Sequence, residues 1–129
     1  MYLPYDQLPD PADKFEIYEE IAQGVNAKVF RAKELDNDRV VALKIQHYDE
    51  EHQVTIEEEY HILRDYCSSP NLPEFYGVYK LVKENGPDEI WFVLEVSWHD
   101  LHLLLIFIQL FLMISLHKVL WWRYSLGYG

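Results

Sequence analysis

Alternating apolar and polar residues predict a series of short strands in the first three quarters of the chain. In "FEIYEEIA" (15–22), every second residue from Phe15 to Ile21, including Ile17, falls on one face, the pattern of a half-buried strand. "RVVALKIQ" (39–46) is β-branched with little alternation and predicts a central strand. The other predicted strands are "AKVFRAKE" (27–34, the hairpin partner of the first), "FYGVYKLV" (75–82) and "EIWFVLEV" (89–96).

The segment "VTIEEEYHILRDY" (54–66) has helical spacing instead. Its apolar residues recur at i, i+4 and i+7, namely Ile56, Tyr60 and Leu63. Glu59 falls on the same side of this helix, and Thr55 with Glu58 has the capping-box spacing of a helix start. The order β-β-β-α-β-β predicts an α+β fold: a five-stranded antiparallel sheet with one helix.

The pattern changes at Val96, after which charged residues almost disappear. Residues 101–122 form one continuous apolar run, which predicts a helix or a buried segment. Residues 1–95 carry 21 acidic and nine basic side chains, a net charge of −12, whereas the remainder carries one acidic and two basic ones. The expected organisation is an irregular, proline-punctuated lead-in (1–14), one folded lobe (15–95) and a divergent apolar helical tail (96–129).

Charge and cysteine content restrict the partners and the compartment. Nucleic-acid binding needs a clustered basic surface, and the acidic lobe has none, so nucleic acid is not an expected partner. Cys67 is the single cysteine, which excludes an internal disulfide and is typical of a reducing compartment. The first residues lack the basic and apolar segments of a signal peptide. We therefore expect a cytoplasmic protein.

Lys44 is the first residue that points to chemistry, because it interrupts an apolar central strand. Burying an ammonium group is costly unless it is paired, so Lys44 either reaches solvent at the end of the strand or has a carboxylate partner. Glu59, a carboxylate on the apolar stripe of the helix, has the same need. The two residues explain each other if they form an ion pair.

After Lys44 and Glu59, the third feature that points to chemistry is the strand–loop–strand segment "IAQGVNAKVF". Gly24 would let its loop approach a phosphate closely. A single glycine in a hairpin is also typical of an ordinary turn. Together with "VALK", a Glu fifteen residues after the Lys, "FYGVY" and "IWFVLE", this loop resembles the N-terminal lobe of a protein kinase. The resemblance is to the sterile-twenty-like group and, within it, to the kinase domain of class III myosins. It covers roughly residues 9–95.

The resemblance implies an ATP site and a role for each matching residue. Lys44, paired with Glu59, would hold the α- and β-phosphates. The other implied contacts are Gly24 in the nucleotide loop, Val29 and Ala42 around the adenine, Leu94 as gatekeeper, and Glu95 and Val96 at the start of the hinge. Two departures stiffen the loop: the outer glycines of the family pattern are Ala22 and Ala27 here.

A larger departure is that no catalytic motif follows the lobe. The family's H-R-D-x-x-x-x-N loop and D-F-G magnesium motif do not occur in residues 96–129. We therefore expect a partial serine/threonine protein kinase domain that binds ATP weakly, lacks the family's Mg²⁺ ligands and does not transfer phosphoryl groups by itself. The alternatives are a non-catalytic interaction module, which could share protein partners with a full-length kinase, and a membrane-tethered lobe.

Three interpretations of the tail remain open. Residues 101–122 are a candidate for membrane association, but they reach the roughly 20 residues of a span only by including His117 and Lys118. A second interpretation is a core helix that replaces the missing lobe. The third is translation of an unspliced intron, because Val96-Ser97 is what GTA-AGT or GTG-AGT encodes and T-rich noncoding DNA encodes mainly Phe, Leu and Ile.

Overall fold

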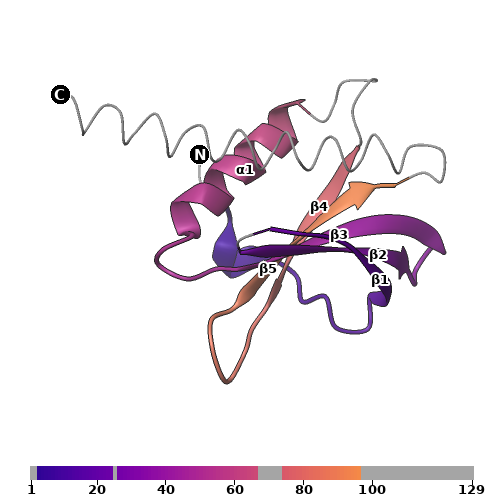
Figure 1. The fold of residues 1–129 in the computed structure, drawn as a ribbon, viewed down its shortest axis with the longest axis horizontal. Coiled ribbons are helices and arrows are strands. Elements are labelled where there is room, and N and C mark those ends of the chain that lie inside the picture. Colours follow the sequence, from indigo (N-terminus) through magenta and orange to yellow (C-terminus); the bar gives the residue numbers. More distant parts are fainter. Residues whose placement is uncertain (1–2, 25, 67–73, 97–129) are drawn as a thin grey trace.

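A computed structural model describes residues 3–24, 26–66 and 74–96, which form one sheet and one long helix (Figure 1). The predicted α+β order is confirmed, and every predicted boundary lies within one residue of the observed one. The elements are a 3-10 turn η1 (Tyr5–Gln7), β1 (Phe15–Gln23), β2 (Ala27–Glu34), β3 (Arg39–His47), α1 (Gln53–Tyr66), β4 (Phe75–Leu81) and β5 (Glu89–Glu95).

The strands form one five-stranded sheet in the order β1-β2-β3-β5-β4, and all neighbouring pairs are antiparallel. The β-branched β3 is the central strand, as its composition predicts. It pairs with β2 on one side and with β5 on the other, so that Lys44 lies opposite both Val29 and Phe92. Directly opposed residues of an antiparallel sheet share a face. These three side chains therefore belong to the same side of the sheet.

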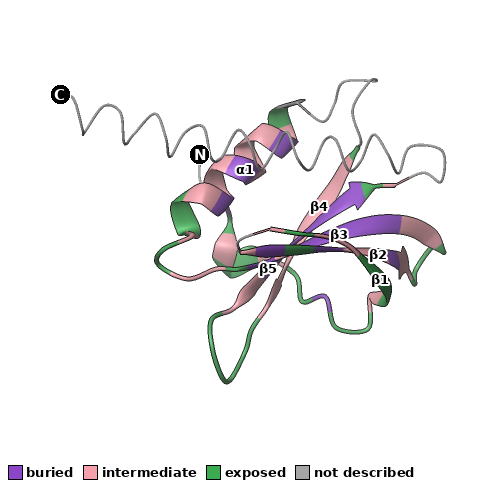
Figure 2. Cartoon of the chain, in the orientation of Figure 1, coloured by how far each residue is buried: buried purple, intermediate pink, exposed green. Residues whose placement is uncertain are grey.

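The two faces of the sheet carry separate apolar clusters, and α1 covers one of them (Figures 1 and 2). The cluster on the α1 side consists of Leu3, Val29, Ala42, Ile56, Leu63, Ile90, Phe92 and Leu94. The cluster on the opposite side consists of Ala32, Val41, Leu43, Trp91 and Val93. Because side chains alternate along β3, Lys44 points toward α1, and it lies between Val29 of β2 and Phe92 of β5.

β1 differs from the half-buried strand that its alternation predicts. Ile17 is 43% exposed, and only Phe15, Ile21 and Ala22 of the strand are partly buried. The pairing with β2 shifts register between Ile17 and Glu20 and again between Glu20 and Ala22. Since each one-residue shift moves the following side chains to the other face, these irregularities break the period of two. As an edge strand, β1 also has a neighbour on one side only.

The start of α1 also differs from the prediction, because the helix begins at Gln53 and the proposed cap at Thr55 lies inside it. Asp49 instead caps the turn that leads into the helix. Its Oδ1 accepts a hydrogen bond from the backbone N of His52 at 3.0 Å, and its carbonyl accepts one from the backbone N of Gln53. A side-chain oxygen that binds the amide three residues later is the ordinary N-cap interaction.

The predicted apolar helical tail lies outside the described residues, apart from Val96 at its start. The same holds for the candidate membrane segment at residues 101–122. Within residues 3–24, 26–66 and 74–96, no helix combines the length and the apolar character that crossing a membrane would require.

Candidate functional site

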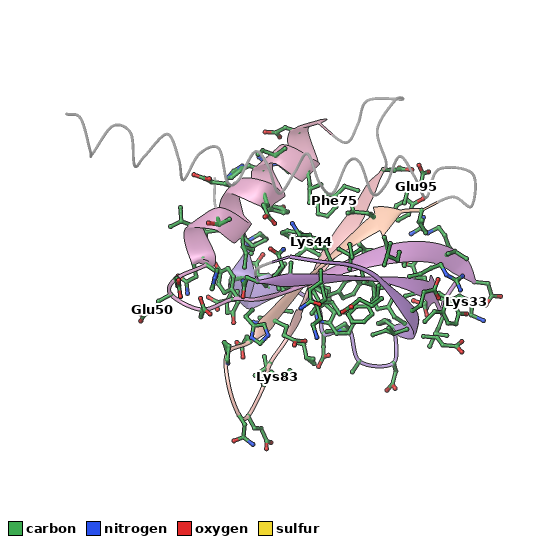
Figure 3. The ribbon with its side chains drawn as sticks, in the orientation of Figure 1. Lys33, Lys44, Glu50, Phe75, Lys83 and Glu95 are labelled. Atoms are coloured by element: carbon green, nitrogen blue, oxygen red, sulfur yellow. The ribbon has the colours of Figure 1, made fainter. Side chains whose placement is uncertain are left out.

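The centre of the candidate site is a buried ion pair between the sheet and the helix. Lys44 Nζ on β3 donates a hydrogen bond to Glu59 Oε2 on α1 at 2.9 Å. The two side chains are only 4% and 5% exposed. Figure 3 shows Lys44 on the side of the sheet that faces α1. The lysine therefore does not reach solvent at the strand end, and the pairing that the two buried charges require is present.

The local sequence explains how these charges meet. Lys44 points toward α1 because it shares the alternation of Ala42, and Glu59 points toward the sheet because it lies on the stripe of Ile56 and Leu63. Each ion would lose several kcal/mol of hydration on burial. The short, charge-assisted hydrogen bond offsets part of that loss. The ion pair thus links the position of the helix to the position of the central strand.

The two residues expected around the adenine, Val29 and Ala42, lie on the same face as Lys44, together with the expected gatekeeper Leu94. Val29 is directly opposite Lys44 on β2, and Ala42 is directly opposite Leu94 on β5. All three belong to the cluster on the α1 side, and they are 2%, 0% and 2% exposed. The structure thus brings together Lys44, Glu59 and these three apolar residues, here named the apolar floor.

The hairpin between β1 and β2 carries the predicted nucleotide loop. Gly24 N donates to Ala27 O at 2.7 Å, which closes the turn, and Asn26 Nδ2 donates to His47 O at 3.0 Å, which ties the loop to the end of β3. Ala27, which replaces a family glycine, is buried. Ala22 lies opposite Val29, so the start of the loop adjoins the apolar floor.

The predicted hinge residues lie at the end of β5. Glu95 is exposed, and its backbone N donates to Glu74 O at 2.8 Å. Its side chain accepts a hydrogen bond of 3.5 Å from the Tyr76 hydroxyl. Val96 is partly buried and packs against the cluster on the α1 side. The backbone of this strand end is therefore held by the residue that precedes β4.

A concavity of about 510 Å³ lies near the nucleotide loop but away from the ion pair. It is lined by residues of β1, β2, β3 and the flanking turns, among them Gly24, Lys28, Ile45 and His47. Lys44, Val29, Ala42 and Leu94 do not line it. Lys28 and Ile45 oppose each other on the face turned away from α1. This cavity is therefore distinct from the predicted adenine contacts.

Sequence reasoning missed one buried polar residue beside the site. Gln46, two positions after Lys44, is 3% exposed, and its Nε2 has no hydrogen-bond partner among the described residues. Because side chains alternate along a strand, Gln46 is expected on the same face as Lys44. The sequence does not indicate which group its side chain contacts. Within the described residues, no group of three or more His, Cys, Asp or Glu side chains could hold a metal ion.

Comparison with known proteins gives relatives for part of the chain, while no family model matches it. Over 95 residues it is 88% identical to Neither inactivation nor afterpotential protein C of Drosophila melanogaster, covering 74% of this chain and 6% of that protein. Over 93 residues it is 41% identical to Myosin-IIIa of Homo sapiens, covering 71% of this chain and 6% of the relative. Serine/threonine-protein kinase mig-15 of Caenorhabditis elegans is 28% identical over 93 residues, with 70% and 8% covered. The chain thus spans less than a tenth of the length of these relatives.

Proposed function

Because the chain is related over about 70% of its length to class III myosins and sterile-twenty-like serine/threonine kinases, we propose that residues 15–95 are the ATP-binding lobe of such a kinase domain. The observation that carries the proposal is the buried ion pair between Lys44 and Glu59. A purely structural core rarely retains two buried charges, since apolar residues of similar volume are often as stable.

Each residue of the candidate site has a role in this proposal. Lys44 would hold the α- and β-phosphates, and Glu59 would fix the lysine by its 2.9 Å contact. Val29 and Ala42 of the apolar floor would contact the adenine, and Leu94 would be the gatekeeper. Gly24 would allow the loop to approach the phosphates, and Glu95 with Val96 would begin the hinge. ATP supplies the transferable phosphoryl group, and these residues bind and orient it.

Phosphoryl transfer is not expected from this chain alone. The reaction depends on positioning and on metal-borne electrostatic stabilisation, with an aspartate that orients the nucleophile. The sequence contains neither an H-R-D-x-x-x-x-N nor a D-F-G motif. We therefore assign no magnesium-dependent step to these residues.

Two features predict that the affinity for nucleotide is low. Ligand pockets usually bury most of the surface of their ligand, whereas one lobe offers only one wall of the kinase cleft. In addition, the apolar floor is almost fully covered, so the free energy of uncovering it subtracts from the binding free energy. The Lys44 and Glu59 side chains, by contrast, are already in contact and need no further ordering.

The test is a binding titration with a fluorescent ATP analogue on the 129-residue chain and two lysine variants. Lys44→Met should abolish specific binding, because it removes the cation that meets the phosphates. The control, Lys83→Met, makes the same change at an exposed lysine that contacts Glu89 on the surface, and should bind like the wild type. Equal binding by wild type and Lys44→Met would refute the assignment of the site.

A non-catalytic interaction module is the second candidate function. Partly buried apolar side chains of α1 and β4 adjoin the cluster on the α1 side, among them Tyr60, Ile62, Phe75 and Val78. Such a surface could bind protein partners shared with a longer kinase. A cytoplasmic location is part of the same proposal, and it rests on the single cysteine and the acidic lobe. Retained partner binding by Lys44→Met, without nucleotide binding by the wild type, would favour the module.

A further inference from the structure

The segment before β1 is built into the lobe. Leu3 is 4% exposed and belongs to the same core cluster as Ile56 and Leu63 of α1. Leu8 packs against that cluster from the end of the 3-10 turn η1. Residues 3–9, here named the N-terminal brace, therefore pack together with the core that supports the helix, although the prolines of this region predict an irregular lead-in.

Tyr5 is the residue that fastens the brace. Its ring stacks on that of Tyr48, with centroids 4.7 Å apart and planes inclined by 16°. Lys80 Nζ of β4 lies 4.3 Å from the centroid of the same ring. The Tyr5 hydroxyl donates a hydrogen bond to the carboxylate of Asp88, in the turn before β5. One side chain thus joins the β3–α1 connection to the β4–β5 hairpin.

Tyr48 continues this set of contacts to the helix. Its hydroxyl donates to Glu57 Oε1 of α1 at 3.0 Å, and its backbone N donates to Asp88 O at 2.8 Å. The brace is also held to β4 by the hydrogen bond from Lys80 N to Pro9 O at 2.9 Å. A chain of direct contacts therefore runs from Tyr5 through Tyr48 to Glu57, two residues before Glu59.

The electrostatics favour the same arrangement. Burial, together with the hydrogen bond to Asp88, raises the pKa of the Tyr5 hydroxyl, so this group remains a donor at neutral pH. The hydrogen bond from Tyr5 lowers the pKa of the Asp88 carboxyl, so this group remains an acceptor. The contact therefore persists across the physiological pH range.

From these contacts we propose that the N-terminal brace positions α1, so that Glu59 is held within reach of Lys44. Leu3 supports the helix from the core, while the Tyr5–Tyr48–Glu57 contacts hold its first turns from outside. Since α1 is a single helix of 14 residues, a constraint on Glu57 is also a constraint on Glu59. Leu3, Tyr5 and Tyr48 are positioning residues in this proposal. Its consequence for ATP rests on the proposed function, but the effect on the ion pair does not.

The experiment compares variants of the 129-residue chain in the absence of nucleotide. Tyr5→Ala removes the ring stack and the hydroxyl contact, whereas Tyr5→Phe keeps the stack and removes only the contact with Asp88. The matched control is Tyr18→Ala, because Tyr18 is an exposed tyrosine of β1 whose ring contacts Arg31. Two quantities are measured: amide hydrogen exchange in α1 and in β3, and the rate at which an amine-reactive ester acylates Lys44.

The proposal predicts that Tyr5→Ala increases exchange in α1 by about fivefold or more, with little change in β3, because a lost aromatic stack of this kind shifts the local opening equilibrium by that order. Acylation of Lys44 should become faster by a similar factor. Tyr5→Phe should show a smaller increase in both, and Tyr18→Ala none.

The proposal is overturned if Tyr5→Ala leaves α1 exchange and Lys44 acylation unchanged. It is also overturned if exchange rises equally in α1 and β3, since the brace would then contribute only general stability. If Tyr5→Ala does not fold, Tyr48→Phe replaces it, because that variant keeps the ring stack and removes the link to Glu57; it must then increase α1 exchange selectively. A wild type that fails to bind nucleotide would refute the proposed function while leaving these results intact.

Discussion

From the buried ion pair between Lys44 and Glu59 we predict how substitutions at these two positions combine in their effect on the free energy of unfolding. Removing one partner of a buried pair leaves the other charge in the core, which costs about 3–5 kcal/mol. Replacing both partners by apolar residues of similar volume is often nearly neutral. Both side chains are at most 5% exposed, so solvent screens the loss of one partner poorly. We therefore expect Lys44→Met and Glu59→Leu each to destabilise the chain by about 3 kcal/mol.

The double variant is the informative one. Its destabilisation should fall at least about 2 kcal/mol short of the sum of the two single effects, because no buried charge remains. The measurement is a double-mutant cycle of the free energy of unfolding, from urea titrations followed by far-ultraviolet circular dichroism. The control cycle uses Arg31→Met and Glu19→Leu, which break a bidentate pair on the surface. Its coupling energy should be much smaller than that of the buried pair, because solvent screens the exposed charges.

The reasoning is refuted if the two cycles give the same small coupling energy. That result would mean that solvent reaches Lys44 and Glu59 in solution as easily as it reaches the surface pair. Glu59→Gln provides a further check when Glu59→Leu unfolds the chain, since it removes the charge and retains a hydrogen-bonding group of similar shape. It should still destabilise the chain more than Glu19→Gln at the surface.

Two further predictions concern the flanks of the site. Asp49→Ala should destabilise the chain through loss of the cap on the turn that leads into α1, whereas Thr55→Ala, inside the helix, should lower the free energy of unfolding by less. Urea titration measures both, and a larger effect at Thr55 would contradict the capping assignment. Burial and the hydrogen bond to Glu57 raise the pKa of Tyr48 to about 12. Since the folded-state pKa lies above the unfolded value of about 10, this stabilisation is complete below pH 10 and is lost as the pH rises through 12. The stability difference between wild type and Tyr48→Phe should therefore narrow across that window, and a constant difference would exclude the linkage.

The positions of the strands are the part of the fold that the sequence predicts best. Their boundaries follow from composition, because β-branched and aromatic runs are separated by turn residues such as those around Gly86, which adopts a positive φ of 102°. The burial of Ile17 was predicted wrongly for a reason that composition does not contain. Two register shifts in β1 depend on how the strand pairs with β2, and pairing is a tertiary property.

The ion pair was predictable because each residue violates the apolar pattern around it. A lysine in a central strand and a glutamate on an apolar stripe are both buried charges. A buried charge is costly unless an oppositely charged group pairs with it, so each residue indicates the other as its partner. The N-terminal brace carries no such signal. Tyr5, Tyr48 and Asp88 do not break the residue pattern of their own segments. Tyr5 and Asp88 are 83 positions apart in the sequence, and only the fold brings them into contact. Thr55 shows the reverse case, where a local motif is present but the helix begins at Gln53, so that Thr55 lies inside it.

The most direct test of the central claim is where ATP binds on the chain. Amide chemical shifts of the isotope-labelled 129-residue protein would be followed while ATP is added, for wild type and Lys44→Met. The account predicts shifts that map to Val29, Ala42, Lys44 and Leu94 in the wild type and vanish in the variant. Shifts confined to the concavity around Lys28 and His47, or shifts that persist in Lys44→Met, would contradict it.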